Sequence, residues 1–204
     1  MTRNNQGEAA PSARGVHGFG PEVEITDPSL VHETALIFGR VRLDRGVSVW
    51  PYVVMRAEMH AIEIGEDTNI QDFVMVHVGA MTPTIVGANC SITHRATIHG
   101  CKIGENTMIG IGATIMDGAV IGRNSVVAGH AIVGENKVFE DNAVIAGVPA
   151  RQVATRDNTQ SNLINARFYS RNAANYAKGQ HRFSEADIGF ILGTGAKPVD
   201  DETD

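Results

Sequence analysis

Apolar residues recur at every sixth position along most of this 204-residue chain, and this repeat restricts the fold more than any other feature. An amphipathic helix spaces its apolar residues three and four apart, and a half-buried strand spaces them two apart. A step of six instead indicates short strands of similar length that each send one branched side chain into a common interior. The pattern is typical of a parallel β-helix built from hexapeptides.

Four runs of the chain follow this step, with breaks between them. One break surrounds Trp50, Pro51 and Tyr52, and another is a surface loop over residues 78–84. A one-residue deletion after Ile98 shifts the repeat once more. The apolar residues spaced by six are Ile25, Val31, Ile37, Leu43 and Val49; Ile64, Ile70 and Val76; Val86, Ile92 and Ile98; and Ile103, Ile109, Ile115, Ile121, Val127 and Val133. The sequence therefore predicts an all-β solenoid.

Composition fits a narrow interior and argues against several classes of protein. Apolar residues make up 43% of the chain but aromatic residues only 5%, so Val, Ile and Ala must fill the interior. A formal net charge of −6 argues against a nucleic-acid partner. No run of eighteen apolar residues predicts a membrane span, and the first residues lack the apolar segment of a secretory signal. Because Cys90 and Cys101 make no disulfide framework, we expect a cytoplasmic protein with reduced thiols and no membrane partner.

The chain divides into four expected segments. Residues 1–22 are rich in small and polar residues and are expected to form a flexible N-terminal arm. Residues 23–153 are expected to form the β-helix domain. Residues 154–180 have helical composition and end at Gly179, so they predict a C-terminal α-helix that packs on the β-helix or on a neighbouring subunit. Residues 181–204 are expected to be a partly disordered tail with an acidic end.

Three histidines, His77, His94 and His99, fall inside the repeat and are the candidate metal ligands. His77 and His94 are seventeen residues apart, close to the eighteen of one three-sided coil, so we expect them at similar positions on adjacent turns. His94 and His99 lie roughly 16 Å apart in a straight strand, which is too far to share one ion within one chain. The spacing works if a metal bridges two subunits, with His77 and His99 from one chain and His94 from its neighbour. Three imidazoles with an open fourth position describe a catalytic zinc-type site.

Longer motifs around these histidines resemble the gamma-class carbonic anhydrase family. The motifs are Arg56-Ala57-Glu58, Asn69-Ile70-Gln71-Asp72, His77, the segment from Ile92 through His94 and His99 to Cys101, and the sequences MDGAVIG and GVPAR. The resemblance covers about residues 30–155. It implies a left-handed parallel β-helix of hexapeptide repeats. It also implies a homotrimer with active sites at the subunit interfaces, and zinc, or iron(II) or cobalt, bound by the three histidines.

The same resemblance implies an activity and further site residues. The metal would lower the pKa of a bound water, giving hydroxide that attacks the small-molecule substrate carbon dioxide and forms bicarbonate. Gln71 resembles the residue that orients the hydroxide or the substrate. Arg56 and Asp72 resemble an ion pair that joins subunits beside the metal. The implied catalytic residues are Arg56, Glu58, Asn69, Gln71, Asp72 and Tyr176.

Some positions depart from the family pattern. Ala57-Glu58 stands where the family has Gly-Asp, and Thr93 stands where it has Gly before the second histidine. Met59 stands where the best-known members carry an acidic proton shuttle. Fast hydration needs a proton carrier, so its loss predicts slow turnover or another substrate, unless His60 carries the proton.

Three other readings stay open on the same scaffold. A metal-dependent hydrolase of small acyl esters or thioesters would use the same hydroxide on an acyl carbon. A hexapeptide acyltransferase would use one histidine as a base and no metal. A non-catalytic trimeric scaffold would hold a structural metal in a closed site.

Overall fold

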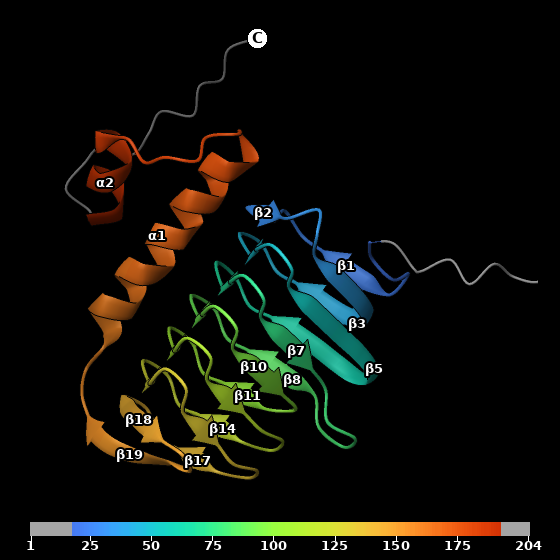
Figure 1. The fold of residues 1–204 in the computed structure, drawn as a ribbon, viewed down its shortest axis with the longest axis vertical. Helices are drawn as coiled ribbons and strands as arrows, with labels where there is room; N and C mark the ends of the chain where they lie inside the picture. Colours follow the sequence, from blue (N-terminus) through green and yellow to red (C-terminus); the bar gives the residue numbers. More distant parts are fainter. Residues whose placement is uncertain (1–17, 193–204) are drawn as a thin grey trace, which may run out of the picture.

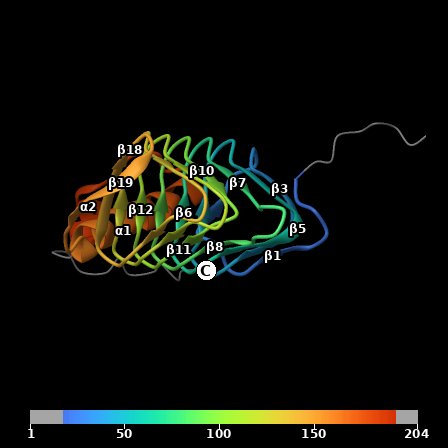
Figure 2. The same cartoon turned by 90° about the horizontal axis from the view of Figure 1, so that it is seen from below.

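The computed structural model describes residues 18–192, in which short strands stack coil upon coil into a three-sided solenoid (Figure 1). Figure 2, turned by 90°, shows the successive coils nested behind one another, with the helices on one side. Nearly all strand pairs are parallel and in register, because each coil repeats the previous one. The predicted all-β solenoid of hexapeptide strands with a C-terminal helix is confirmed. Residues 1–17 of the expected arm and residues 193–204 of the expected tail lie outside the described part of the chain.

The three faces follow from how two long strands, β3 (Leu36–Leu43) and β5 (Val54–Ile64), split their pairing. The first residues of β5 pair with β7 and its last residues pair with β8, so the chain bends onto a new face within one strand. The first face continues through β7 (Met75–His77), β10 (Thr97–His99), β13 (Thr114–Ile115) and β16 (Ile132–Val133). The second face contains β1 (Val23–Ile25), β8 (Thr84–Val86), β11 (Lys102–Ile103), β14 (Val120–Ile121) and β17 (Val138–Phe139).

The third face is a separate eight-stranded sheet. It consists of β2 (Leu30–Val31), β4 (Ser48–Val49), β6 (Asn69–Ile70), β9 (Ser91–Ile92), β12 (Met108–Ile109), β15 (Val126–Val127), β18 (Ala143–Gly147) and β19 (Ala150–Thr155). The last two strands are antiparallel, so this hairpin ends the stack of parallel coils. We call the turn from the third face to the first the first corner, and the turn from the first face to the second the second corner.

The residues of the six-residue step fill the interior. Ile70, Ile92, Ile98, Ile109 and Ile115 are completely buried, one per strand. Burying such a side chain contributes about 1.5–3 kcal/mol, so stacked isoleucines can hold a solenoid that has few aromatic residues.

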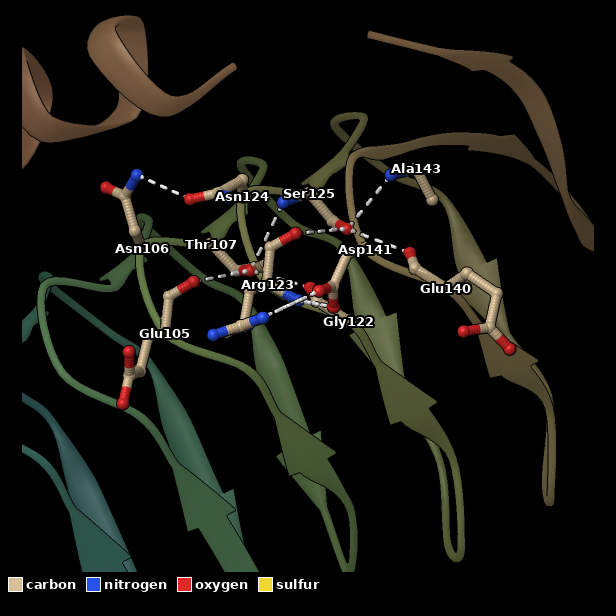
Figure 3. Close-up of polar contacts among 10 residues, drawn as sticks. All are labelled: Glu105, Asn106, Thr107, Gly122, Arg123, Asn124, Ser125, Glu140, Asp141 and Ala143. Atoms are coloured by element: carbon tan, nitrogen blue, oxygen red, sulfur yellow. Dashed lines mark hydrogen bonds and ion pairs between the residues drawn. The ribbon is translucent and has the colours of Figure 1, made fainter. Parts of the chain in front are cut away.

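At the remaining corner, between the second and third faces, polar side chains link one coil to the next (Figure 3). The Asn106 amide donates to Asn124 Oδ1 of the next coil at 2.9 Å, and both residues have positive φ, which Asn tolerates better than most residues. The Thr107 hydroxyl accepts from the Ser125 N–H, and the Ser125 hydroxyl accepts from the Ala143 N–H (Figure 3). These bonds satisfy backbone groups that the turns leave free.

Helix α1 (Thr159–Ala177) follows the hairpin and runs back along the third face (Figure 1). Asn162 is buried, and its amide donates to the Asn106 and Ser125 carbonyl groups, which fixes the start of the helix to the corner. A short helix, α2 (Glu185–Leu192), lies within the segment expected to be the tail and packs on α1. No helix within residues 18–192 has the length and apolar character needed to cross a membrane.

The coil that starts in β7 is longer than the regular eighteen residues, and this shifts the histidines. The coil that starts in β7 carries the additional loop 78–83, so His77 pairs in register with His99, 22 residues later. The expectation that His77 and His94 occupy similar positions on adjacent turns is therefore wrong. A regular coil of eighteen residues would place them so, but loop 78–83 adds residues between β7 and β8.

Candidate functional site

His77 and His99 lie side by side at the second corner. They end the neighbouring strands β7 and β10, and Nδ1 of His77 is 3.0 Å from Nε2 of His99. Their ring centroids are 4.9 Å apart and the rings are tilted by 58°. The parallel register places both imidazoles on the same edge of the first face, which makes them a pair.

A carboxylate contacts each outer nitrogen of this pair. Glu58 Oε2 lies 2.9 Å from His77 Nε2, and Asp117 Oδ2 lies 2.7 Å from His99 Nδ1. Burial alone would raise the pKa of Glu58, but a hydrogen bond with its own backbone, the His77 contact and the Arg56 charge lower it. Arg56 forms an ion pair with Glu58. The second corner therefore brings together Arg56, Glu58, His77 and His99, four of the residues proposed from the sequence.

A cleft of about 340 Å³ opens beside this pair. Its lining residues are Arg56, Glu58, Met59, His77, Val78, Gly79, Ala80 and His99. Met59, Val78 and Ala80 give one side an apolar surface, and no acidic residue comes from loop 78–83.

The remaining candidates gather at the first corner, at the other end of the same face. His94 lies in the turn before β10, and its Nδ1 is 3.0 Å from Asp72 Oδ2. Oε1 of the Gln71 side chain accepts from the His94 backbone N–H at 3.3 Å, and its Nε2–H donates to Asn69 Oδ1 at 2.9 Å. Asn69 and Gln71 are each only 1% exposed, so this chain of bonds fixes the backbone at His94.

The tyrosine at this corner is Tyr169, which sequence reasoning missed. The Tyr169 hydroxyl is 3.2 Å from His94 Nε2, and burial together with the Asp72 charge raises the pKa of Tyr169. Tyr176 instead packs on Trp50 and His181, with ring centroids 5.0 Å and 4.6 Å away. The two tyrosines are seven residues apart and share a helix face, so only the packing distinguishes them.

The donor groups of the second corner fit a divalent metal such as zinc. Ligand atoms about 2.0–2.1 Å from a tetrahedral zinc lie about 3.3 Å apart, close to the separation of the two facing imidazole nitrogens. The Asp117 contact at Nδ1 leaves His99 Nε2 as the nitrogen available to a metal. Within residues 18–192 of one chain, no three His, Cys, Asp or Glu side chains are placed to hold a metal together, because His94 lies at the other corner.

The Arg56–Asp72 pair inferred from the sequence is not formed within one chain. Arg56 pairs with Glu58 at the second corner, and Asp72 contacts His94 at the first. The candidate residues thus form two half-sites: Arg56, Glu58, His77 and His99 at one corner, and Asn69, Gln71, Asp72, His94 and Tyr169 at the other.

Comparison with known proteins gives the family. Residues 100–135 match the family described as bacterial transferase hexapeptide (six repeats). The chain is 37% identical over 155 residues to gamma carbonic anhydrase 1 of Arabidopsis thaliana, a mitochondrial protein, covering 73% of this chain and 54% of the relative. It is also 36% identical over 138 residues to the carnitine operon protein CaiE of Escherichia coli, covering 67% of this chain and 70% of that protein. The chain belongs to the gamma carbonic anhydrase-like family of hexapeptide-repeat proteins.

This gamma carbonic anhydrase-like chain spans about half the length of several curated relatives. It covers 54% of the Arabidopsis protein and 52% of the protein YrdA of Escherichia coli, to which it is 34% identical over 95 residues. Solved structures show the same fold. An acetyltransferase-like protein of Bacillus cereus superposes with a TM-score of 0.75 at 23% identity, covering 79% of this chain and 97% of that chain. A hexapeptide transferase family protein of Anaplasma phagocytophilum superposes with a TM-score of 0.62 at 29% identity, covering 77% and 96%.

Proposed function

We propose that this protein is a gamma-type carbonic anhydrase that hydrates carbon dioxide at a metal site shared between two copies of the chain. The observation that carries this proposal is the His77–His99 pair, with 3.0 Å between facing nitrogens and Asp117 on the outer nitrogen of His99. Similarity to gamma carbonic anhydrase 1 supports the reaction.

His77 and His99 of one copy and His94 of the next copy would hold zinc, or iron(II) or cobalt. When bound, such a cation supplies a Lewis acid that brings the pKa of water towards neutrality. His94 suits this role because Asp72 contacts its Nδ1, which selects Nε2 as the nitrogen for the metal. The Tyr169 hydroxyl, 3.2 Å from that nitrogen, would be displaced when a metal binds.

The shared site leads to a homotrimer. The two half-sites lie at opposite ends of one face, so joining unlike half-sites is a head-to-tail contact that must close into a ring. A ring of three places one complete site at each interface. In this ring Arg56 of one copy would meet Asp72 of the next, because the junction joins the two half-sites that contain these residues.

The chain's own side chains would then position the substrate. Met59, Val78 and Ala80 line the cleft beside the histidine pair and suit an uncharged molecule such as carbon dioxide. Gln71 is buried, and its amide is bonded to Asn69 and to the His94 backbone, so it would act by fixing the turn that carries His94 to the junction. Glu58 accepts from His77 and would keep that ring in one orientation.

A second candidate function is acyl transfer with His94 as the base. The His94 Nδ1 contact with Asp72 Oδ2 at 3.0 Å is already formed in one chain, and such a pair orients an imidazole for proton abstraction. This mechanism needs no metal, so metal content separates it from hydration.

Stopped-flow hydration of carbon dioxide by protein of measured metal content tests the proposal. The protein is loaded in parallel with zinc, cobalt and iron(II). We expect hydration that is lost in His94→Ala and kept in the control His130→Asn, because His130 is exposed and lies two coils further along the same corner. Full metal loading without hydration would reject the reaction, and ester and thioester hydrolysis would be assayed next. Acyl transfer by metal-free protein would instead select the second candidate.

A further inference from the structure

The proposed function counts Asp117 among the contacts of the histidine pair but gives this carboxylate no role of its own. It lies one coil beyond His99, in the turn after β13, and its Oδ2 is 2.7 Å from His99 Nδ1. Both side chains are 29% exposed, so the contact is partly shielded from water. The residue belongs to the MDGAVIG sequence, whose other members are apolar or small.

The carboxylate sits in a slot between two glycines. A Cβ at Gly79 would lie 1.9 Å from Asp117 Oδ1, and a Cβ at Gly100 would lie 2.7 Å from the same atom. Gly100 also has a φ of +54°, which side chains rarely adopt. Both positions must therefore lack a side chain for Asp117 to reach His99.

Further bonds hold this slot in place. The Gly100 N–H donates to the Thr84 hydroxyl at 2.9 Å and to the His77 carbonyl at 3.1 Å. The Thr82 hydroxyl, in loop 78–83, lies 3.4 Å from Asp117 Oδ1. The backbone of one histidine and the loop after it thus build the slot that positions the other histidine.

We infer that Asp117 is the positioning residue of His99: it accepts the Nδ1–H and fixes the tautomer and ring direction that present Nε2 to a metal. The inference rests on the proposed function only in requiring that His99 bind a metal. An unprotonated Nε2 is the form that coordinates, and a hydrogen bond at the other nitrogen selects it. Loss of such a contact lowers metal affinity about 10–100-fold.

The test is the affinity of the full-length chain for cobalt(II), measured from its visible absorption in competition with a chelator. Asp117→Asn keeps the size of the side chain but replaces one carboxylate oxygen with an NH₂ group. This group can donate to His99 Nδ1 and so favour the wrong tautomer. We expect about 10–100-fold weaker binding. The matched control is Asp141→Asn, which removes a carboxylate paired with Arg123 at a different corner and should bind cobalt as the wild type does.

A second measurement uses the wild-type protein, so its result does not depend on whether a variant folds. In metal-free wild-type protein, nitrogen NMR of His99 should show the proton on Nδ1. A proton on Nε2, or an Asp117→Asn affinity within twofold of the wild type, would overturn the inference. Wild-type protein that binds no cobalt would overturn it together with the proposed function. Tight cobalt binding without hydration would reject the reaction alone and leave Asp117 in its role.

Discussion

The Tyr169 hydroxyl lies 3.2 Å from Nε2 of His94, so the C-terminal helix contributes directly to the first corner. The Tyr169 ring also packs edge-on against Trp50, with centroids 5.7 Å apart. Helix α1 is therefore more than a cover for the third face. It fixes the direction of the histidine that we assign to the neighbouring copy's metal.

We expect Tyr169→Phe to tighten metal binding about two- to tenfold, because a metal on Nε2 must displace this hydrogen bond, worth about 0.5–1.5 kcal/mol, while the ring packing on Trp50 remains. The matched control is Tyr176→Phe, which removes a hydroxyl from the other tyrosine on the same helix face. Cobalt(II) affinity, measured in competition with a chelator, reports the effect. Equal metal affinities in the two variants would contradict the assignment of Tyr169 rather than Tyr176.

An exposed aromatic stack at the first corner leads to a prediction about assembly. Tyr52 and Phe73 are 57% and 55% exposed, their rings stack 5.1 Å apart, and both have positive φ, which is unfavourable for bulky residues. Phe73 directly follows Asp72, so a neighbouring copy seated on this half-site would cover it. In Phe73→Asn the asparagine tolerates the positive φ of this position, and the apolar ring is removed.

We expect Phe73→Asn to weaken the trimer at least tenfold in sedimentation velocity, as loss of about 1.4 kcal/mol or more of apolar burial implies. The control is Val138→Thr. Val138 is 64% exposed, but it lies on the second face near the end of the stack. A Phe73→Asn trimer as stable as the wild type would place the subunit interface elsewhere.

The docking of α2 on α1 depends on Asp187. Burial alone would raise the pKa of Asp187, but hydrogen bonds from the Ser184 N–H and hydroxyl, together with the Arg171 ion pair, hold it well below its usual range. Because the folded-state pKa is lowered, this stabilisation is fully present above the unfolded value of about 3.9 and is lost as the pH falls through the folded value.

We therefore expect Asp187→Asn at neutral pH to speed amide hydrogen exchange in α2, while exchange in the solenoid strands stays unchanged. As the pH falls below about 4 towards the folded-state pKa of Asp187, wild-type α2 should progressively approach the same change, after correction for intrinsic exchange rates. Glu185→Gln, in the first turn of α2, is the control. Unchanged exchange in Asp187→Asn would show that other contacts hold α2.

Much of the fold could be predicted from the sequence because a single rule repeats. Ile64, Ile70, Ile92, Ile98 and Ile109 lie six apart within their runs, and all are fully buried. The helix over 185–192 lies within the expected tail, since eight residues are too few to show a clear helical period. This helix forms against α1, where Arg171 of α1 pairs with Asp187 of α2.

The site could be predicted only in part. The residue types and motifs singled out residues that the fold gathers at two corners, yet the position of His77 against His99 depends on loop 78–83, whose added length changes which residues become neighbours. Asp117 and Tyr169 were missed because they come from the next coil and from the helix, and their contacts arise only when the chain has folded.

The most direct test of the shared site is complementation between two inactive variants. His77→Ala lacks one half-site and His94→Ala lacks the other, so equal amounts mixed under verified subunit exchange should recover about one quarter of the wild-type sites in a three-membered ring. The control mixture, His77→Ala with His99→Ala, loses the same half-site twice and should recover none. Recovery of metal binding and hydration only in the first mixture is the predicted result. No recovery in either mixture would contradict a metal site built from two copies of the chain.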